Sequence, residues 1–113
     1  MENNKKSGNE KKTAHEIKHE IRKETREDVK FVREEARELR KEVNEDLKEF
    51  KEEERSSNDL YAEDIISAAK QDAREIKKEI KEEAKAAKHE IRQDARDFIH
   101  DVNEAKRKEN KKK

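Results

Sequence analysis

Hydrophobic residues recur along most of the chain at steps of 3, 4 and 4 residues, a spacing that repeats every eleven residues. Eleven residues in three turns give about 3.67 residues per turn, close to the α-helical period, so these positions share one face of a helix. We call this predicted face the seam. Its members are Ala14, Ile17, Ile21, Val32, Ala36, Leu39, Val43, Leu47, Phe50, Ala62, Ile65, Ala69, Ala73, Ile76, Ile80, Ala84, Ala87, Ile91, Ala95, Phe98 and Val102.

The charged residues follow the same repeat. The residue after a seam position is mostly Lys or Arg, and the residue before it is mostly Asp or Glu. Because one residue turns a helix by about 100°, the seam has a basic flank on one side and an acidic flank on the other. Parallel helices bring opposite flanks together, whereas antiparallel helices bring like flanks together. The charges therefore favour parallel association, although each exposed pair contributes only about 0.2–1 kcal/mol.

The composition excludes a globular core and leaves long helices as the predicted fold. Of 113 residues, 27% are hydrophobic and 55% are charged, which is too few apolar residues for a globular core. The chain has no proline, no cysteine and one glycine, Gly8, so nothing interrupts a helix after the first residues. We expect an all-α protein with one or two very long amphipathic helices, arranged as a hinged helix or a helical hairpin, that forms coiled coils.

The chain divides into five predicted parts. They are a polar, disordered tail (1–12), a first helix (13–55), a break or hinge (56–58), a second helix (59–107) and a basic tail (108–113). Thr13 and Glu16 match a capping box, and Asp59 is an acid suited to a helix N-terminus. The repeat carries four extra residues at the join, which a continuous helix could absorb and a hairpin loop could equally use. The capping signals favour a break, while the flank charges disfavour folding the two halves against each other.

One motif has the form of a metal site. His15, Glu16 and His19 satisfy the H-E-x-x-H pattern of zinc metalloproteases, in which both histidines bind zinc and the glutamate acts as a base. The repeat by itself produces this match, because both histidines occupy positions that Arg or Lys fills in other repeats. We therefore expect no enzyme, no cofactor and no specific metal site.

The remaining features bear on location and partners. No apolar run approaches the roughly 20 residues that span a bilayer, and residues 1–12 lack the apolar segment of a secretory signal. We expect a soluble cytoplasmic protein without disulfides. The formal net charge is zero and the basic C-terminal tail has no aromatic residue to stack on a base, so we do not expect nucleic acid as a partner.

The repeat unit resembles that of known helical families. Its first eight positions follow Ala-[Arg/Lys]-Glu-[Ile/Leu]-[Lys/Arg]-x-Glu-[Ile/Val], and the eleven-residue unit is clearest at 36–46 and 73–83. It resembles hendecad coiled coils and is similar to the peripheral-stalk helices of rotary ATPases, which implies an oligomerisation or scaffold module pairing with itself or a similar helix. It also resembles the eleven-residue repeats of late-embryogenesis-abundant proteins and of apolipoprotein-like lipid-surface helices. That likeness implies a stress-protective helix or a membrane-surface helix as the alternative.

Overall fold

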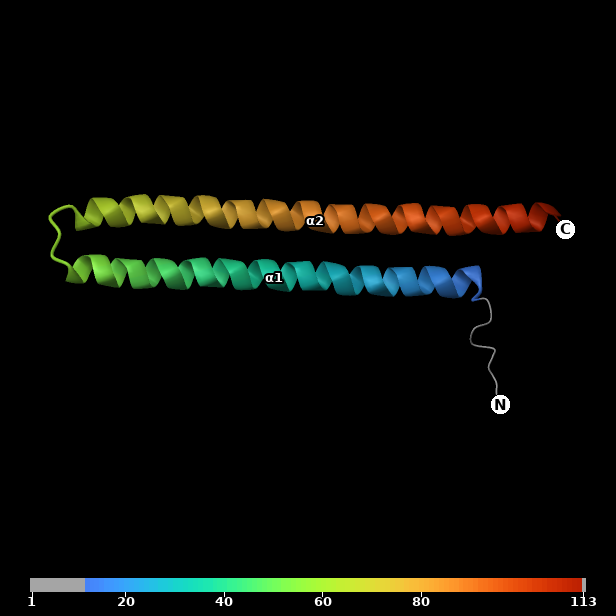
Figure 1. Ribbon diagram of the computed structural model, residues 1–113, viewed down its shortest axis with the longest axis horizontal. Coiled ribbons are helices and arrows are strands. Elements are labelled where there is room, and N and C mark those ends of the chain that lie inside the picture. Colours follow the sequence, from blue (N-terminus) through green and yellow to red (C-terminus); the bar gives the residue numbers. More distant parts are fainter. Residues whose placement is uncertain (1–11, 113) are drawn as a thin grey trace, which may run out of the picture. The chain divides into compact units, whose positions relative to one another are not determined.

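The computed structural model describes residues 12–112, and in this range the chain consists of two long helices (Figure 1). Helix α1 spans Ala14–Ser56 and helix α2 spans Ala62–Lys112. The all-α fold of two long helices forming a hairpin is therefore confirmed. Helix α2 continues beyond residue 107, where the sequence predicted its end. Residues 1–11 of the predicted polar tail lie outside the described range.

Helix α1 begins with the capping box that the sequence predicted. The backbone N–H of Glu16 donates to Thr13 Oγ1 at 3.1 Å, and the N–H of Thr13 donates to Glu16 Oε1 at 3.3 Å. Two backbone donors of the first turn, which have no partner within the helix, are satisfied in this way. The Glu16 carboxyl accepts from both the N–H and the hydroxyl of Thr13, the latter at 3.0 Å, and these two hydrogen bonds hold the pKa of Glu16 below its usual value.

The two helices are separated by a short connection at residues 57–61. The N–H of Ser57 still donates to the carbonyl of Glu53, at 3.1 Å, but Asn58 has φ 58°, a left-handed conformation that ends the helix. Asp59 Oδ1 then accepts the N–H of Tyr61 at 2.8 Å, which supports the turn leading into α2. A break, and not a continuous helix, therefore occupies the join.

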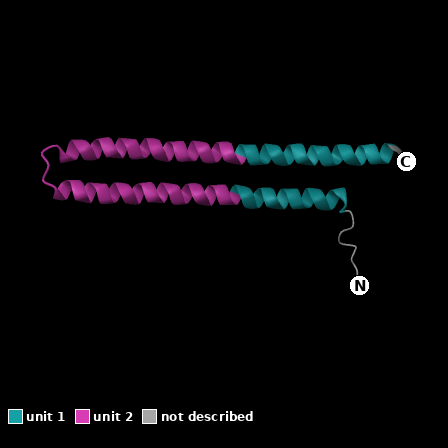
Figure 2. Ribbon diagram, viewed as in Figure 1, with its two compact units in different colours: residues 1–29, 89–113 teal, residues 30–88 magenta. Residues whose placement is uncertain are grey.

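The chain forms two compact units, coloured separately in Figure 2. Unit 2, residues 30–88, contains the second part of α1, the connection and the first part of α2, and it is an antiparallel helical hairpin. Unit 1 pairs the beginning of α1 with the end of α2, also side by side and antiparallel. Hydrogen bonds join the helices in both units: Lys77 Nζ donates to Asn44 Oδ1 at 2.8 Å in unit 2, and Lys18 Nζ donates to Asn103 Oδ1 at 3.0 Å in unit 1.

The inner face of unit 2 is defined by the residues that the opposite helix covers. In α1 and α2 these buried or half-buried positions succeed each other at steps of 3 or 4 residues. They are Val32, Ala36, Arg40, Val43, Leu47, Lys51 and Glu54 in α1, and Ala62, Ile66, Ala69, Ala73, Lys77, Ile80, Ala84, Ala87 and Lys88 in α2, where both Ala87 and Lys88 follow Ala84 by such a step. Ile66, only 1% exposed, is the one large side chain that is fully buried within residues 12–112.

The antiparallel arrangement differs from what the flank charges suggested. Like flanks do meet in each unit, but a like-charge pair on an exposed surface costs only a few tenths of a kcal/mol. Burying one isoleucine contributes about 1.5–3 kcal/mol. The long basic side chains also relieve the repulsion, since Lys77 and Arg40 cover the interior with their stems and direct their charged ends to polar groups, Asn44 Oδ1 and the carbonyl of Ala36.

Candidate interaction surface

The structure places the predicted seam partly inside and partly outside the helix pair. Ala36 and Ala73 are buried, and five members are exposed: Leu39 (43%), Phe50 (36%), Ile65 (36%), Ile76 (46%) and Phe98 (59%). The other members are half-buried; they are Ala14, Ile17, Ile21, Val32, Val43, Leu47, Ala62, Ala69, Ile80, Ala84, Ala87, Ile91, Ala95 and Val102.

The exposed members share one position of the repeat. At this position the structure covers the residue that follows the predicted seam residue. Ile66 is buried and Ile65 is exposed, and in the same way Arg40 lies on the inner face while Leu39 is exposed. Val29, 7% exposed, follows the same rule in unit 1. Val29, Ile66 and the half-buried Ile99 are apolar at a position that the other repeats give to Lys or Arg, and that was the signal in the sequence for the shift.

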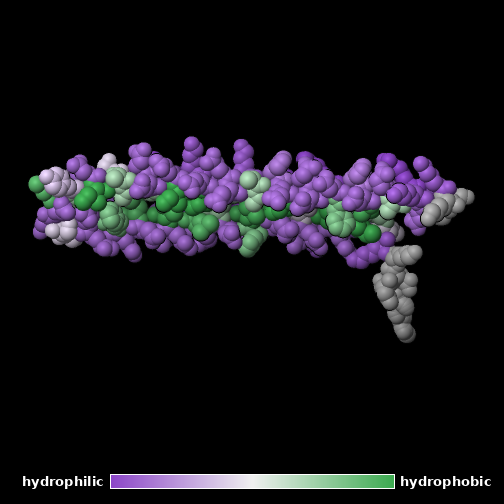
Figure 3. Space-filling model, turned by 45° about the horizontal axis from the view of Figure 1, so that its top comes forward, coloured by the Kyte–Doolittle hydropathy of each residue, from purple (hydrophilic) through white to green (hydrophobic). Residues whose placement is uncertain are grey.

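The four exposed seam residues of unit 2, Leu39, Phe50, Ile65 and Ile76, form what we call the apolar edge. They lie eleven residues apart within each helix, so they repeat at the same rotation and at intervals of about 16 Å along it. Figure 3 shows hydrophobic side chains as a band between hydrophilic ones in this unit. Apolar residues that recur at one rotation of each helix, and that remain exposed after the hairpin has formed, are typical of an interaction surface.

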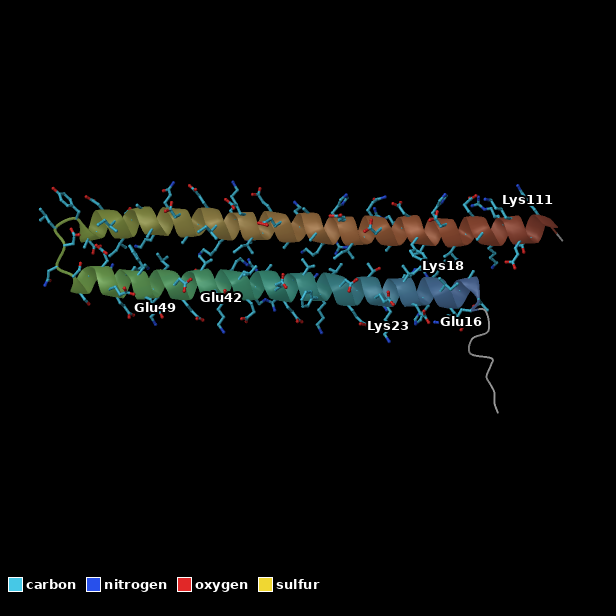
Figure 4. The ribbon with its side chains drawn as sticks, viewed as in Figure 1. Glu16, Lys18, Lys23, Glu42, Glu49 and Lys111 are labelled. Atoms are coloured by element: carbon cyan, nitrogen blue, oxygen red, sulfur yellow. The ribbon has the colours of Figure 1, made fainter. Side chains whose placement is uncertain are left out.

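Carboxylates accompany the apolar edge. Inner-face residues Ala36, Leu47, Ala73 and Ala84 are each preceded by an acid and followed by a base. The preceding acids are Glu35, Asp46, Asp72 and Glu83, and the following bases are Arg37, Lys48, Arg74 and Lys85. Since each step turns the helix by about 100°, the acids lie on the side of the apolar edge and the bases lie on the opposite side. Two further acids of α1, Glu42 and Glu49, project away from α2 in Figure 4.

A groove lined by cations occupies the basic side of unit 2; we call it the basic groove. Its lining residues are Arg37, Arg40, Lys41, Asn44, Arg74, Lys77, Lys78 and Lys81. The hydrogen bond from Lys77 to Asn44 crosses it. Within residues 12–112, none of these cations has a carboxylate within 4.0 Å, so the described part of the chain does not neutralise the charge of the groove. Antiparallel packing produces this concentration, because it brings both basic flanks to one face.

Unit 1 has a groove on the acidic side of its helix pair. It is lined by the seam residues Ile17, Ile21, Ile91, Ala95 and Phe98, by Thr25, and by the acidic residues Glu20, Glu24, Asp28 and Asp94. Phe98 is 59% exposed along this groove. The acidic flanks of α1 and α2 therefore share one face, together with exposed apolar residues.

Glu16, the acid of the histidine motif, takes part in helix capping, and the neighbouring Glu20 forms a surface ion pair. His15, Glu16 and His19 lie together on α1 beside Glu20, but Glu16 is bonded to Thr13 and Glu20 accepts from Lys12 Nζ at 2.6 Å. That hydrogen bond raises the pKa of Lys12. In the described part of the chain, no group of three or more His, Cys, Asp or Glu side chains is placed to hold a metal ion.

No protein-family model, curated protein or solved structure matches the chain. Within residues 12–112, neither helix has an apolar stretch long enough to cross a membrane. The surface features that distinguish this protein are therefore the apolar edge and the two charged faces, which are consistent with an interaction module.

Proposed function

We propose that the protein is a structural module for coiled-coil oligomerisation or scaffolding, without catalytic chemistry, and that it binds itself or a similar helix. The apolar edge carries this proposal. Leu39 and Ile76 remain 43% and 46% exposed although each helix already has a partner within the chain. Covering such side chains contributes about 25 cal/mol for each Å² removed from water, so a further helix along this edge gains energy at every repeat.

The charges support parallel association between neighbouring helices of different copies. A parallel neighbour places the basic flank of one helix against the acidic flank of the next, as in g-to-e′ pairing. The intrachain pairing buries apolar side chains but brings like-charged flanks together, so each unit has a basic face and an acidic face. A second copy in the parallel direction can pair both, and this association should weaken as salt screens the charges beyond about 10 Å.

Sedimentation velocity over a concentration series tests the proposal. The wild-type chain should associate, and Ile76→Asp should weaken this association because a charge would be placed against an apolar contact. Gln71→Asp is the matched control, since Gln71 lies on the same helix at an exposed position outside the apolar edge. Equal effects of the two substitutions would contradict the proposal.

Circular dichroism of the same samples separates the alternative functions. An interaction module should be helical in plain buffer, and its helical signal should not require drying or lipid. A spectrum that becomes helical only on drying would favour a stress-protective helix, and one that becomes helical only on vesicles would favour a lipid-surface helix.

Cysteine crosslinking tests the direction. Ser57 and Asn110 lie near opposite ends of α2, and both are exposed. Separate Ser57→Cys and Asn110→Cys variants should each crosslink with themselves if copies run parallel. Efficient crosslinking only in a mixture of the two variants would show antiparallel association.

A further inference from the structure

The basic groove of unit 2 has a charge that the described part of the chain does not neutralise. Seven cations line it and, among residues 12–112, no carboxylate does. The groove lies on the face opposite the apolar edge, because Arg37 and Glu35 are separated by about 200° around α1, as Arg74 and Asp72 are around α2. Unit 2 therefore has two faces of opposite charge.

We propose that the basic groove receives the apolar edge, with its neighbouring carboxylates, of a second copy of this chain. The inference rests on the proposed function and names the partner of the same surface. Complementarity supports it: Glu35 and Asp46 are eleven residues apart, as are Asp72 and Glu83, and the bases Arg37–Lys48 and Arg74–Lys85 have the same separation. A translation of one copy onto the next brings each carboxylate near a cation in the parallel direction.

The same charges oppose a closed dimer made from two apolar edges. Such a dimer would bring Asp46 and Glu83 of both copies together, so carboxylates would face carboxylates. When an apolar edge lies on a basic groove, the aliphatic stems of the lining residues cover the apolar side chains while their charged ends meet the carboxylates. Arg37 and Arg74 can also stack on an aromatic ring such as Phe50.

This contact is heterologous, because two different surfaces of the same unit meet. Because the copies are related by translation, the assembly does not close into a ring. One end keeps a free groove and the other end keeps a free edge, so the assembly grows by addition at its ends. A polyphosphate backbone is a less suitable occupant. The groove has no aromatic residue among its lining to stack on bases, and the formal net charge of zero gives no long-range attraction to nucleic acid.

Three variants of the full chain test the inference by sedimentation velocity. The edge variant carries Glu35→Lys, Asp46→Lys and Glu83→Lys. Its matched control carries Glu34→Lys, Glu45→Lys and Glu82→Lys, which change the net charge equally at exposed positions one residue earlier, facing outward. The groove variant carries Arg37→Gln, Lys41→Gln and Arg74→Gln. All substituted positions are exposed, and circular dichroism verifies that helicity is retained.

The wild-type mass should keep rising with concentration, without a plateau at a dimer. The edge and groove variants should each associate roughly ten-fold more weakly at about 0.15 M salt, and the control should behave as wild type. A plateau at a dimer, or equal behaviour of all three variants, would overturn the inference. If Ile76→Asp still weakened association in that case, the proposed function would survive.

Two further outcomes also decide the matter. A wild-type chain that stays monomeric at every concentration would overturn the inference and self-association together. If a monomeric chain bound a single-stranded oligothymidylate at about 0.15 M salt, and the groove variant did not, the occupant of the groove would be a phosphate backbone and not a second copy.

Discussion

Replacing Ile66 by alanine should destabilise the hairpin more than the same change at its neighbour Ile65. Ile66 is 1% exposed, so Ile66→Ala removes three carbon atoms from a fully covered site. At about 0.8 kcal/mol for each carbon group, the transfer energy lost is about 2.4 kcal/mol, and the cavity left behind raises the expected loss to roughly 2–4 kcal/mol.

Ile65 is 36% exposed, and it lies at the rim where neighbours and water can fill the space. Because only the covered part of the Ile65 side chain contributes transfer energy, Ile65→Ala should lower the free energy of unfolding by at most about 1.5 kcal/mol, and it should leave no large cavity. Alanine improves helix propensity by a few tenths of a kcal/mol in both variants, so this effect cancels between them. The free energies of unfolding of the two variants should therefore differ by roughly 0.5–2.5 kcal/mol.

Urea unfolding followed by circular dichroism at 222 nm measures both values. The measurement is made at low protein concentration and repeated at a higher one, because association would add a concentration-dependent stability. If Ile65→Ala cost as much as Ile66→Ala or more, the inner face would follow the predicted seam and the assignment of the apolar edge would be refuted.

Three further outcomes follow from local contacts. Thr13→Ala removes the capping hydroxyl, and the first turn of α1 should lose about 0.5–2 kcal/mol, seen as faster amide exchange there but not in the middle of the helix. The pKa of Glu16 is lowered in the folded chain, so its contribution is present above its ordinary pKa of 4.5 and is lost as pH falls through the lowered value. An acid titration by NMR should show this fraying in the wild type, and Glu16→Gln should abolish the pH dependence. Asn58 is left-handed, so Asn58→Val should destabilise by about 1–2 kcal/mol while Asn58→Gly stays within about 0.5 kcal/mol in thermal unfolding.

The sequence was sufficient for everything that depends on neighbours along the chain. The capping box at Thr13, the two helices and the break near Ser57 follow from side chains acting within about one turn. The acidic and basic flanks are also local, because the rotation of about 100° for each residue fixes them once the helix exists. Which surface each flank would face did not follow from neighbours along the chain. The flank charges by themselves favoured parallel pairing, whereas the two helices pair antiparallel.

Only the packing of one helix on the other decided which residues in and beside the seam became the inner face. Leu39 and Arg40, or Ile65 and Ile66, are adjacent on the helix, and the repeat permits either to point inward. The opposite helix covers Arg40 and Ile66, because antiparallel contact centres on a line between the seam and the basic flank, where long basic stems can lie over the interior with their charges outside. That shift leaves Leu39 and Ile65 exposed, and it creates the surface on which the proposed association depends.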